Sequence, residues 1–257
     1  MPDGTPPSLF DLSGKVAIVT EADSAVGRSI AQQLAAHGAA VCVSAESDDA
    51  SRKVAENIQA DWASGSGNAF AIPSQLTGQA ECEALIASVV AQAGKVDILV
   101  CQAASGSAAG GIGAGIERMQ WLTRKACENM ASRKDGAVVV IGSVDALKGA
   151  PDAGGLSVAS AAGMQIVRNI AAEWGPSNIR ANGVAIAEIS DSPAASADED
   201  AQKQQLVEWT YPMQRTGNAE EVAGCVVAMV SAAAAWTTGQ TIVIDGGMMA
   251  GSGRVEG

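Results

Sequence analysis

Short apolar, β-branched runs alternate along this chain with longer segments in which apolar residues recur at helical spacing. Each short run is typical of a buried strand, and each longer segment is typical of an amphipathic helix. The predicted strands are Lys15–Thr20, Ala40–Ser44, Asn68–Ile72, Val96–Cys101, Ala137–Ile141, Arg180–Ile186 and Thr241–Ile244. The predicted helices are Ser24–His37, Ala50–Ser64, Gln79–Ala93, Glu117–Arg133, Leu156–Trp174 and Ala219–Ala235.

Strand–helix alternation over nearly the whole chain indicates βαβ units, a parallel sheet and helices on both of its faces. We therefore predict one Rossmann-like, doubly wound α/β domain over residues 1–257. Two segments depart from the pattern: Ser105–Gly115 is predicted to be a flexible loop, and about 189–211 a mobile acidic lobe. Because doubly wound sheets bind ligands beyond the strand carboxyl ends, we expect the turn after Lys15–Thr20, the loop after Val96–Cys101 and the Ser143 loop to share one cleft.

Charge and cysteine content narrow the kinds of partner. The net charge of −12 argues against nucleic acid and against anionic membrane surfaces, both of which need basic patches. The five cysteines are scattered and form no C-x-x-C pair, so we expect reduced thiols and a cytoplasmic protein. The longest apolar run, Val222–Trp236, has 15 residues. A membrane span needs about 20, so no membrane partner is expected.

The segment from Ala137 to Arg180 carries the most specific motif. A buried strand leads to Ser143, and a long helix follows. This arrangement resembles the active-site segment of the short-chain dehydrogenase/reductase family, in which the helix bears a Tyr-x-x-x-Lys motif. Cys101–Ala104 is similar to the family's N-N-A-G motif, and Gly239–Gly247 to its C-terminal strand. The resemblance implies a Rossmann-like fold and hydride transfer with a nicotinamide cofactor.

The catalytic positions depart from that family pattern. In the family, the tyrosine is the general acid/base, the lysine lowers its pKa, the serine orients the substrate oxygen and an asparagine carries a water. Leu156 stands at the tyrosine position, Ser160 at the lysine position and Gly115 near the asparagine position. Only Ser143 remains, and a leucine cannot ionise. We therefore expect no catalytic residue in the family's sense, with Ser143 the sole survivor.

The cofactor turn departs as well. Residues 20–27 align with the family's T-G-x-x-x-G-x-G turn, whose glycines let backbone N–H groups approach a diphosphate. Glu21 and Ala25 replace two of these glycines, and only Gly27 remains, for helix packing. At about 5 Å and an effective dielectric constant of about 20, the Glu21 carboxylate would cost about 3 kcal/mol against each phosphate charge. We therefore expect no cofactor on this chain.

Other chemistries have little support in the sequence. The only histidine, His37, is predicted at the end of the first helix, far from the strand carboxyl ends, so we expect neither a Ser-His-Asp triad nor a metal site. Lys148 follows Ser143 closely enough for a nucleophile–base pair. Lysines occur at such positions in active relatives of the family, however, so Lys148 gives this pair little support.

These departures lead to the functional expectation. We expect a catalytically inactive subunit that pairs with a homologous, active, NAD-dependent subunit in a hetero-oligomer, for which we expect a tetramer, with NAD on the partner. The chain is similar in kind to the non-catalytic subunit of heteromeric family members, one of which acts on 2-(hydroxy(phenyl)methyl)succinyl-CoA in anaerobic toluene breakdown. Two alternatives stay open, namely a ligand-binding or regulatory module and an enzyme of non-redox mechanism that uses the cleft.

Overall fold

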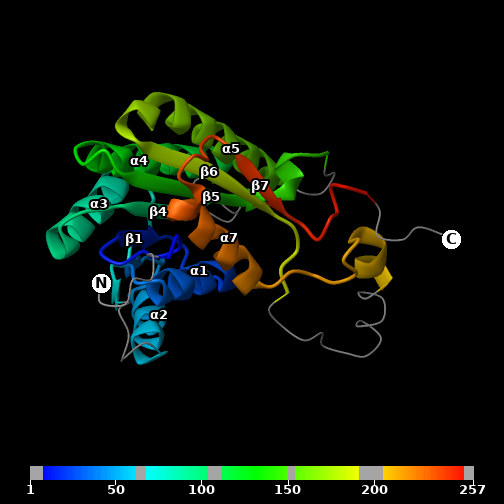
Figure 1. Ribbon diagram of the computed structural model, residues 1–257, viewed down its shortest axis with the longest axis horizontal. Helices are drawn as coiled ribbons and strands as arrows, with labels where there is room; N and C mark the ends of the chain where they lie inside the picture. Colours follow the sequence, from blue (N-terminus) through cyan, green and yellow to red (C-terminus); the bar gives the residue numbers. More distant parts are fainter. Residues whose placement is uncertain (1–7, 62–67, 104–110, 150–153, 191–204, 252–257) are drawn as a thin grey trace.

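Seven parallel strands form one sheet in the order β3-β2-β1-β4-β5-β6-β7. The computed structural model describes residues 8–61, 68–103, 111–149, 154–190 and 205–251 (Figure 1). The strands are β1 Val16–Val19, β2 Ala40–Val43, β3 Asn68–Ala71, β4 Ile98–Gln102, β5 Gly136–Ser143, β6 Ile179–Ile186 and β7 Thr241–Ile244. The predicted doubly wound parallel sheet is confirmed, and its strand order reverses between β1 and β4.

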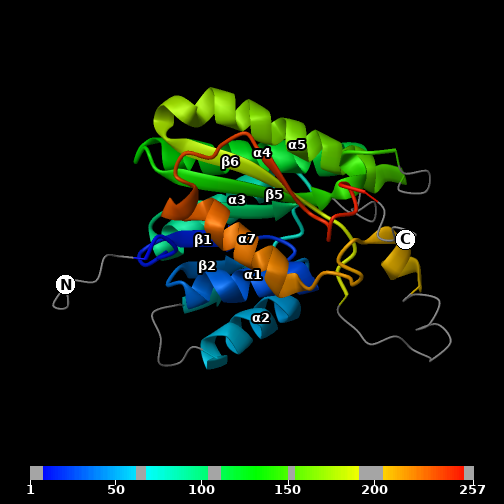
Figure 2. The ribbon, with the colours of Figure 1, turned by 45° about the vertical axis from the view of Figure 1, so that its right-hand side comes forward.

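Helices cover both faces of the sheet (Figure 2). They are α1 Ala25–Ala36, α2 Asp48–Asp61, α3 Gln79–Ala93, α4 Gly111–Ala131, α5 Gly154–Trp174 and α7 Ala219–Val230. Apolar residues of α1, α2 and α7 form one core with the sheet, and those of α3, α4 and α5 form the other. Among the described residues, no helix has both the length and the apolar character needed to cross a membrane.

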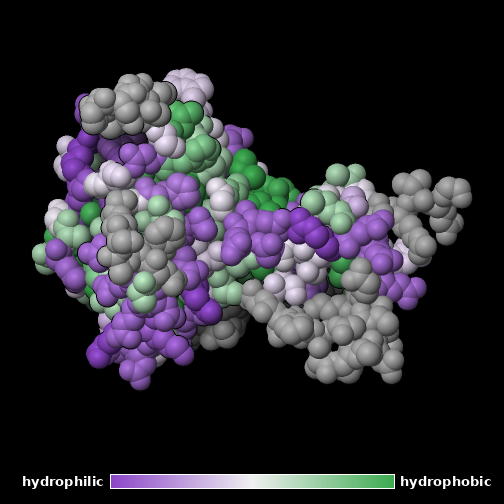
Figure 3. Space-filling model, turned by 60° about the horizontal axis from the view of Figure 1, so that its bottom comes forward, coloured by the Kyte–Doolittle hydropathy of each residue, from purple (hydrophilic) through white to green (hydrophobic). Residues whose placement is uncertain are grey.

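The strands are apolar throughout because both of their faces are buried. In β1, Ala17 and Val19 enter one core while Val16 and Ile18 enter the other. This alternation at a period of two residues explains why the sequence shows a continuous apolar run rather than an apolar–polar pattern. In Figure 3, hydrophilic side chains cover much of the rounded body, and apolar side chains gather on it near the place where the projecting part joins.

Both segments that were predicted to be irregular differ in part from the prediction. Helix α4 begins at Gly111, so residues 111–115 are helical rather than part of a loop. Ile112 in this first turn packs against α5 at Gly155, where an added Cβ would lie 2.5 Å from Ile112 Cγ1. The other residues of that predicted loop, 105–110, lie outside the described residues, as do residues 191–204 of the expected lobe. Residues 205–210 of that lobe are helical.

Arg180 of β6 joins the sheet to the end of α7. Its Nη1 donates to the Met229 carbonyl at 2.6 Å, and its Nη2 donates to the Ser231 carbonyl at 3.2 Å. Hydrogen bonds from a charged donor contribute more than neutral ones, so we expect Arg180→Met to lower the free energy of unfolding by about 2 kcal/mol. Urea denaturation measures the change, with Arg180→Lys as the variant that keeps the charge. An unchanged denaturation midpoint in Arg180→Met would refute this role.

Candidate functional site

A cleft of about 460 Å³ opens at the carboxyl ends of β1, β4, β5 and β6. Its lining residues are Glu21, Gln102, Ala103, Ile141, Gly142, Ser143, Val144, Asp145, Lys148, Leu156, Ile186, Ala187, Glu188, Tyr211 and Met248. The first strand–helix turn, the end of β4 and the Ser143 loop therefore meet at one site, as the sequence predicted. The cleft lies beside the point where strand order reverses, which is where doubly wound sheets bind ligands.

Ser143 ends β5 and faces this cleft with fixed hydrogen bonds. Its Oγ donates to Asp145 Oδ2 at 3.1 Å and accepts from the Asp145 backbone N–H at 3.1 Å. Its own N–H donates to Ser160 Oγ at 3.0 Å. Lys148 Nζ lies 3.9 Å from Asp145 Oδ1, so the polar groups run Ser143–Asp145–Lys148. The direct Ser143–Lys148 pair considered from the sequence is replaced by this order.

The three positions of the missing family residues have separate roles. Leu156 is 38% exposed and lines the cleft, where a tyrosine was sought. Ser160 is fully buried and supports the backbone of Ser143. Gly115 is buried in α4 and lines a different cavity, so it does not join Ser143. These positions therefore carry none of the family's titratable groups.

The first strand–helix turn has an unusual backbone. Glu21 has a φ of +51°, a left-handed conformation that favours glycine. Ser24 Oγ caps α1 by accepting from the Gly27 N–H at 3.0 Å. A Cβ on Gly27 would lie 2.3 Å from the Glu21 carbonyl oxygen, so this position requires glycine for packing, as expected. Ala25, the other replaced glycine, is simply the first residue of α1.

Glu21 is paired with a cation that the sequence did not reveal. Arg118 of α4 donates from Nη2 to Glu21 Oε1 at 3.0 Å. Burial raises the pKa of Glu21, and Arg118 opposes that shift. Gln102 Nε2 also donates to Ser24 Oγ at 2.8 Å, which ties the end of β4 to the turn. The expected repulsion between Glu21 and phosphate is therefore smaller than for an unpaired carboxylate.

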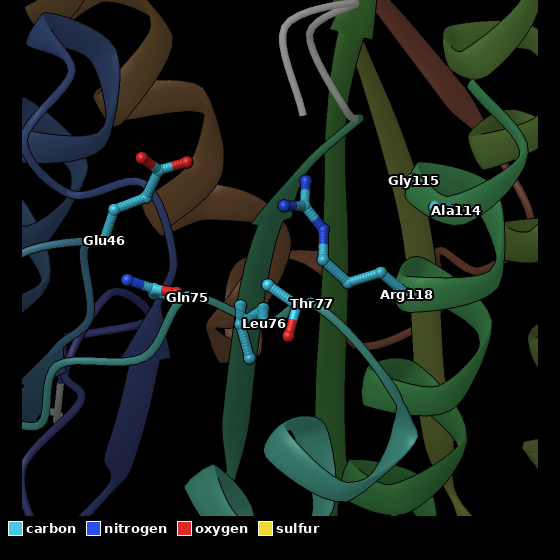
Figure 4. Close-up of a pocket in the computed structure, with 7 residues that line it drawn as sticks. All are labelled: Glu46, Gln75, Leu76, Thr77, Ala114, Gly115 and Arg118. Carbon is cyan, nitrogen blue, oxygen red and sulfur yellow. The ribbon is translucent and has the colours of Figure 1, made fainter. Parts of the chain in front are cut away.

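A second cavity, of about 160 Å³, is lined by Arg118 (Figure 4). The Arg118 side chain projects from α4, and Glu46, which follows β2, lies on the opposite side of the cavity (Figure 4). Gln75 and Thr77, which follow β3, complete its polar wall. Because Glu21 lines the first cleft and Arg118 lines the second cavity, the ion pair lies between the two.

Tyr211 is the cleft residue that the sequence analysis missed. It is the only tyrosine of the chain, and it follows helix 205–210 within the segment predicted as a mobile lobe. That segment has no hydrophobic periodicity, so nothing in the sequence placed its side chain. The structure brings Tyr211 to the same cleft as Ser143.

Comparison with known proteins identifies the relatives of this chain. A family model described as enoyl-(acyl carrier protein) reductase matches residues 21–249. Dehydrogenase/reductase SDR family member 4 from Bos taurus is 30% identical over 251 residues, covering 93% of this chain and 88% of that protein. 7alpha-hydroxysteroid dehydrogenase from Escherichia coli K12 is 30% identical over 246 residues, covering 92% and 94%. A structure of 7 alpha-hydroxysteroid dehydrogenase complexed with NADH and 7-oxo glycochenodeoxycholic acid has a TM-score of 0.82 and 30% identity, covering 95% and 98%.

These relatives correct the functional expectation. They span nearly the whole chain and are named as dehydrogenases. The expectation of a catalytically inactive subunit, and of a pseudoenzyme or non-redox alternative, is therefore wrong. It rested on the motif positions alone, and it did not include Tyr211 or the pairing of Glu21 with Arg118.

Proposed function

Because the chain belongs to the short-chain dehydrogenase/reductase family, we propose that it is a nicotinamide-dependent oxidoreductase acting on a hydroxyl or carbonyl group of an apolar molecule. The observation that carries this proposal is the cleft at the strand carboxyl ends, where the Ser143 hydroxyl lies between charged side chains and an apolar wall. A hydroxyl beside an apolar wall suits an apolar substrate whose polar atom must be fixed in place.

The walls of the cleft support a bulky apolar substrate. Ile141, Val144, Leu156, Ile186 and Met248 line it, and its volume of about 460 Å³ is within the range of small-molecule sites. The relatives include a dehydrogenase of a hydroxysteroid, so steroid and aryl alcohols or ketones are the first substrate classes to test.

The residues around the crevice fit a dinucleotide whose diphosphate is held by a cation instead of a glycine turn. Glu46 lines the second cavity after β2, where an acid suits the ribose hydroxyls of NAD and disfavours the 2′-phosphate of NADP. Arg118 lies between the two cavities and would pair with the diphosphate. Ser143, Ile186 and Ala187 would border the nicotinamide. When bound, the cofactor supplies or accepts the hydride.

Calorimetry of the purified chain with NAD⁺, NADH, NADP⁺ and NADPH tests the cofactor, and nicotinamide absorbance with steroid and aryl substrates tests the reaction. We expect NADH to bind in preference to NADPH and at least one ketone to be reduced. Failure of every dinucleotide to bind would refute the proposal and favour the earlier expectation of no cofactor on this chain. Binding without turnover would refute the oxidoreductase function alone.

Glu21→Gly should tighten NAD binding about tenfold, which is about 1.4 kcal/mol. The substitution removes the carboxylate that competes with a diphosphate for Arg118, and glycine adopts the left-handed backbone of this position without strain. Titration calorimetry measures the affinity, and Glu21→Gln serves as the control that loses charge but keeps size. An unchanged or weaker affinity in Glu21→Gly would contradict a cofactor role for the ion pair.

The expected homologous partner subunit remains a proposal of its own. Val158 of α5 and Trp236, beyond α7, are exposed apolar side chains that a partner subunit would cover. Native mass spectrometry of the protein isolated from its own cells distinguishes a hetero-oligomer from a homo-oligomer.

A further inference from the structure

The only tyrosine of the chain is held rigidly against the cleft. Tyr211 is 6% exposed, and its backbone N–H donates to the Val207 carbonyl at 2.9 Å. Its ring packs on Gly246, where an added Cβ would lie 3.6 Å from Tyr211 Cδ1. The Gly246 carbonyl accepts from the Met213 N–H at 3.1 Å, so the segments on both sides of the ring are joined. Because the ring is held by these contacts, the phenol oxygen of Tyr211 has a fixed position at the cleft.

The surroundings of the phenol connect it to Ser143. The Glu188 backbone donates a hydrogen bond to the phenol oxygen, and the Asp145 carboxylate is close enough to act on its charge. Asp145 is also the carboxylate that accepts from Ser143 Oγ. Ser143 and Tyr211 both line the cleft, which they reach from β5 and from the segment after helix 205–210, and Asp145 lines it with them.

We propose that Tyr211 is the proton donor of this cleft, and that its O–H together with Ser143 Oγ holds the carbonyl oxygen of the substrate. The inference rests on the proposed function. It also explains how the site works with Leu156 at the helix position, because the donor comes from a different segment.

The step balances in atoms and electrons. The substrate carbon gains a hydride, supplied by a reduced nicotinamide dinucleotide, and the C=O π bond opens onto its oxygen. That oxygen takes the proton of Tyr211, so the phenol O–H bond breaks as the O–H bond of the product alcohol forms. Water at the open side of the cleft returns a proton to the phenolate.

The charges around Tyr211 keep its phenol in the protonated form that reduction requires. Burial raises the pKa of Tyr211, nearby carboxylates raise it further, and the hydrogen bond from the Glu188 backbone opposes this shift. The carboxylates are Glu188, Asp145 and Asp245, and Lys148 is held on Asp145. The phenol is therefore protonated at neutral pH, as a donor must be. Reduction should lose rate only as pH rises above the ordinary tyrosine value of about 10.

Tyr211→Phe tests the proposal, with Trp209→Phe as the matched control because Trp209 is an exposed aromatic residue two positions away. We expect Tyr211→Phe to lower kcat for ketone reduction about 100-fold, within the usual range for a general acid. NADH affinity and the melting temperature should match those of Trp209→Phe. The residual activity of Tyr211→Phe should no longer fall as the pH rises into the alkaline range.

A second readout does not depend on turnover. Because the chain has one tyrosine, a ¹³C-labelled tyrosine gives a single NMR signal, which 7-oxo glycochenodeoxycholic acid or an aryl ketone should shift. Ketone reduction that persists in Tyr211→Phe would overturn this inference and leave the proposed function standing. A signal shift without any wild-type turnover would refute both the oxidoreductase function and the proton transfer, leaving only the oxygen contact. If the ketone caused no signal shift and the wild-type chain showed no turnover, both proposals would be overturned in full.

Discussion

Ser143→Ala is expected to lower kcat for ketone reduction about 100-fold, because it removes the hydroxyl that would turn its proton from Asp145 to the developing oxyanion of the substrate. The hydroxyl lies at the end of β5 and is oriented by Asp145, with the backbone fixed by Ser160 Oγ. Affinity for NADH should remain within a factor of about two, because the lost interaction forms with the substrate oxygen in the transition state. Steady-state kinetics and calorimetry together measure both quantities.

Ser132→Ala is the matched control for this substitution. Ser132 is an exposed serine whose Oγ donates only to the Asn129 carbonyl at 3.3 Å, outside the cleft. It should leave kcat unchanged. Equal rates for Ser143→Ala and Ser132→Ala would show that Ser143 is a structural residue of the β5 end and not part of the chemistry.

Most of the fold follows from the sequence because the sheet is buried on both faces. Runs such as Val96–Cys101 have no polar face to compete with a strand interpretation, and the helices between them carry one apolar side. Boundaries shift where a tertiary contact decides them. The composition of residues 111–115 is typical of a loop. In the structure, Ile112 packs against Gly155, and helix α4 includes these residues.

Only part of the candidate site could be predicted from the sequence in the same way. Ser143 was found because it follows a strand at a recognisable spacing. The Glu21–Arg118 pair joins residues 97 positions apart, and no local pattern relates them. Tyr211 is placed by its packing on Gly246, a contact between two irregular segments. Substituted motif positions therefore show where the family's own groups are missing, but they do not show which other side chains reach the cleft.

Asp97 holds the two strands that flank the cleft, and its removal should cause the largest loss of stability. Its carboxylate is buried at 3% exposure, and its Oδ2 accepts from the Val16 N–H at 2.9 Å. Lys95 Nζ lies 2.8 Å from the same oxygen, and Arg133 Nη2 lies 3.6 Å from Oδ1. This cluster fixes the start of β1 beside the start of β4.

Asp97→Ala leaves the buried Val16 N–H without its acceptor and removes the carboxylate that pairs with Lys95 and Arg133, so the free energy of unfolding should fall by about 3 kcal/mol. Asp97→Asn keeps an acceptor for the Val16 N–H and should lose about half as much, since only the charge is removed. Asp135→Asn is the control, because Asp135 pairs with Lys15 at 53% exposure and surface pairs are worth less than about 1 kcal/mol. Urea denaturation of the three variants measures the order. If Asp97→Ala were as stable as Asp135→Asn, the β1–β4 junction would depend on strand pairing alone.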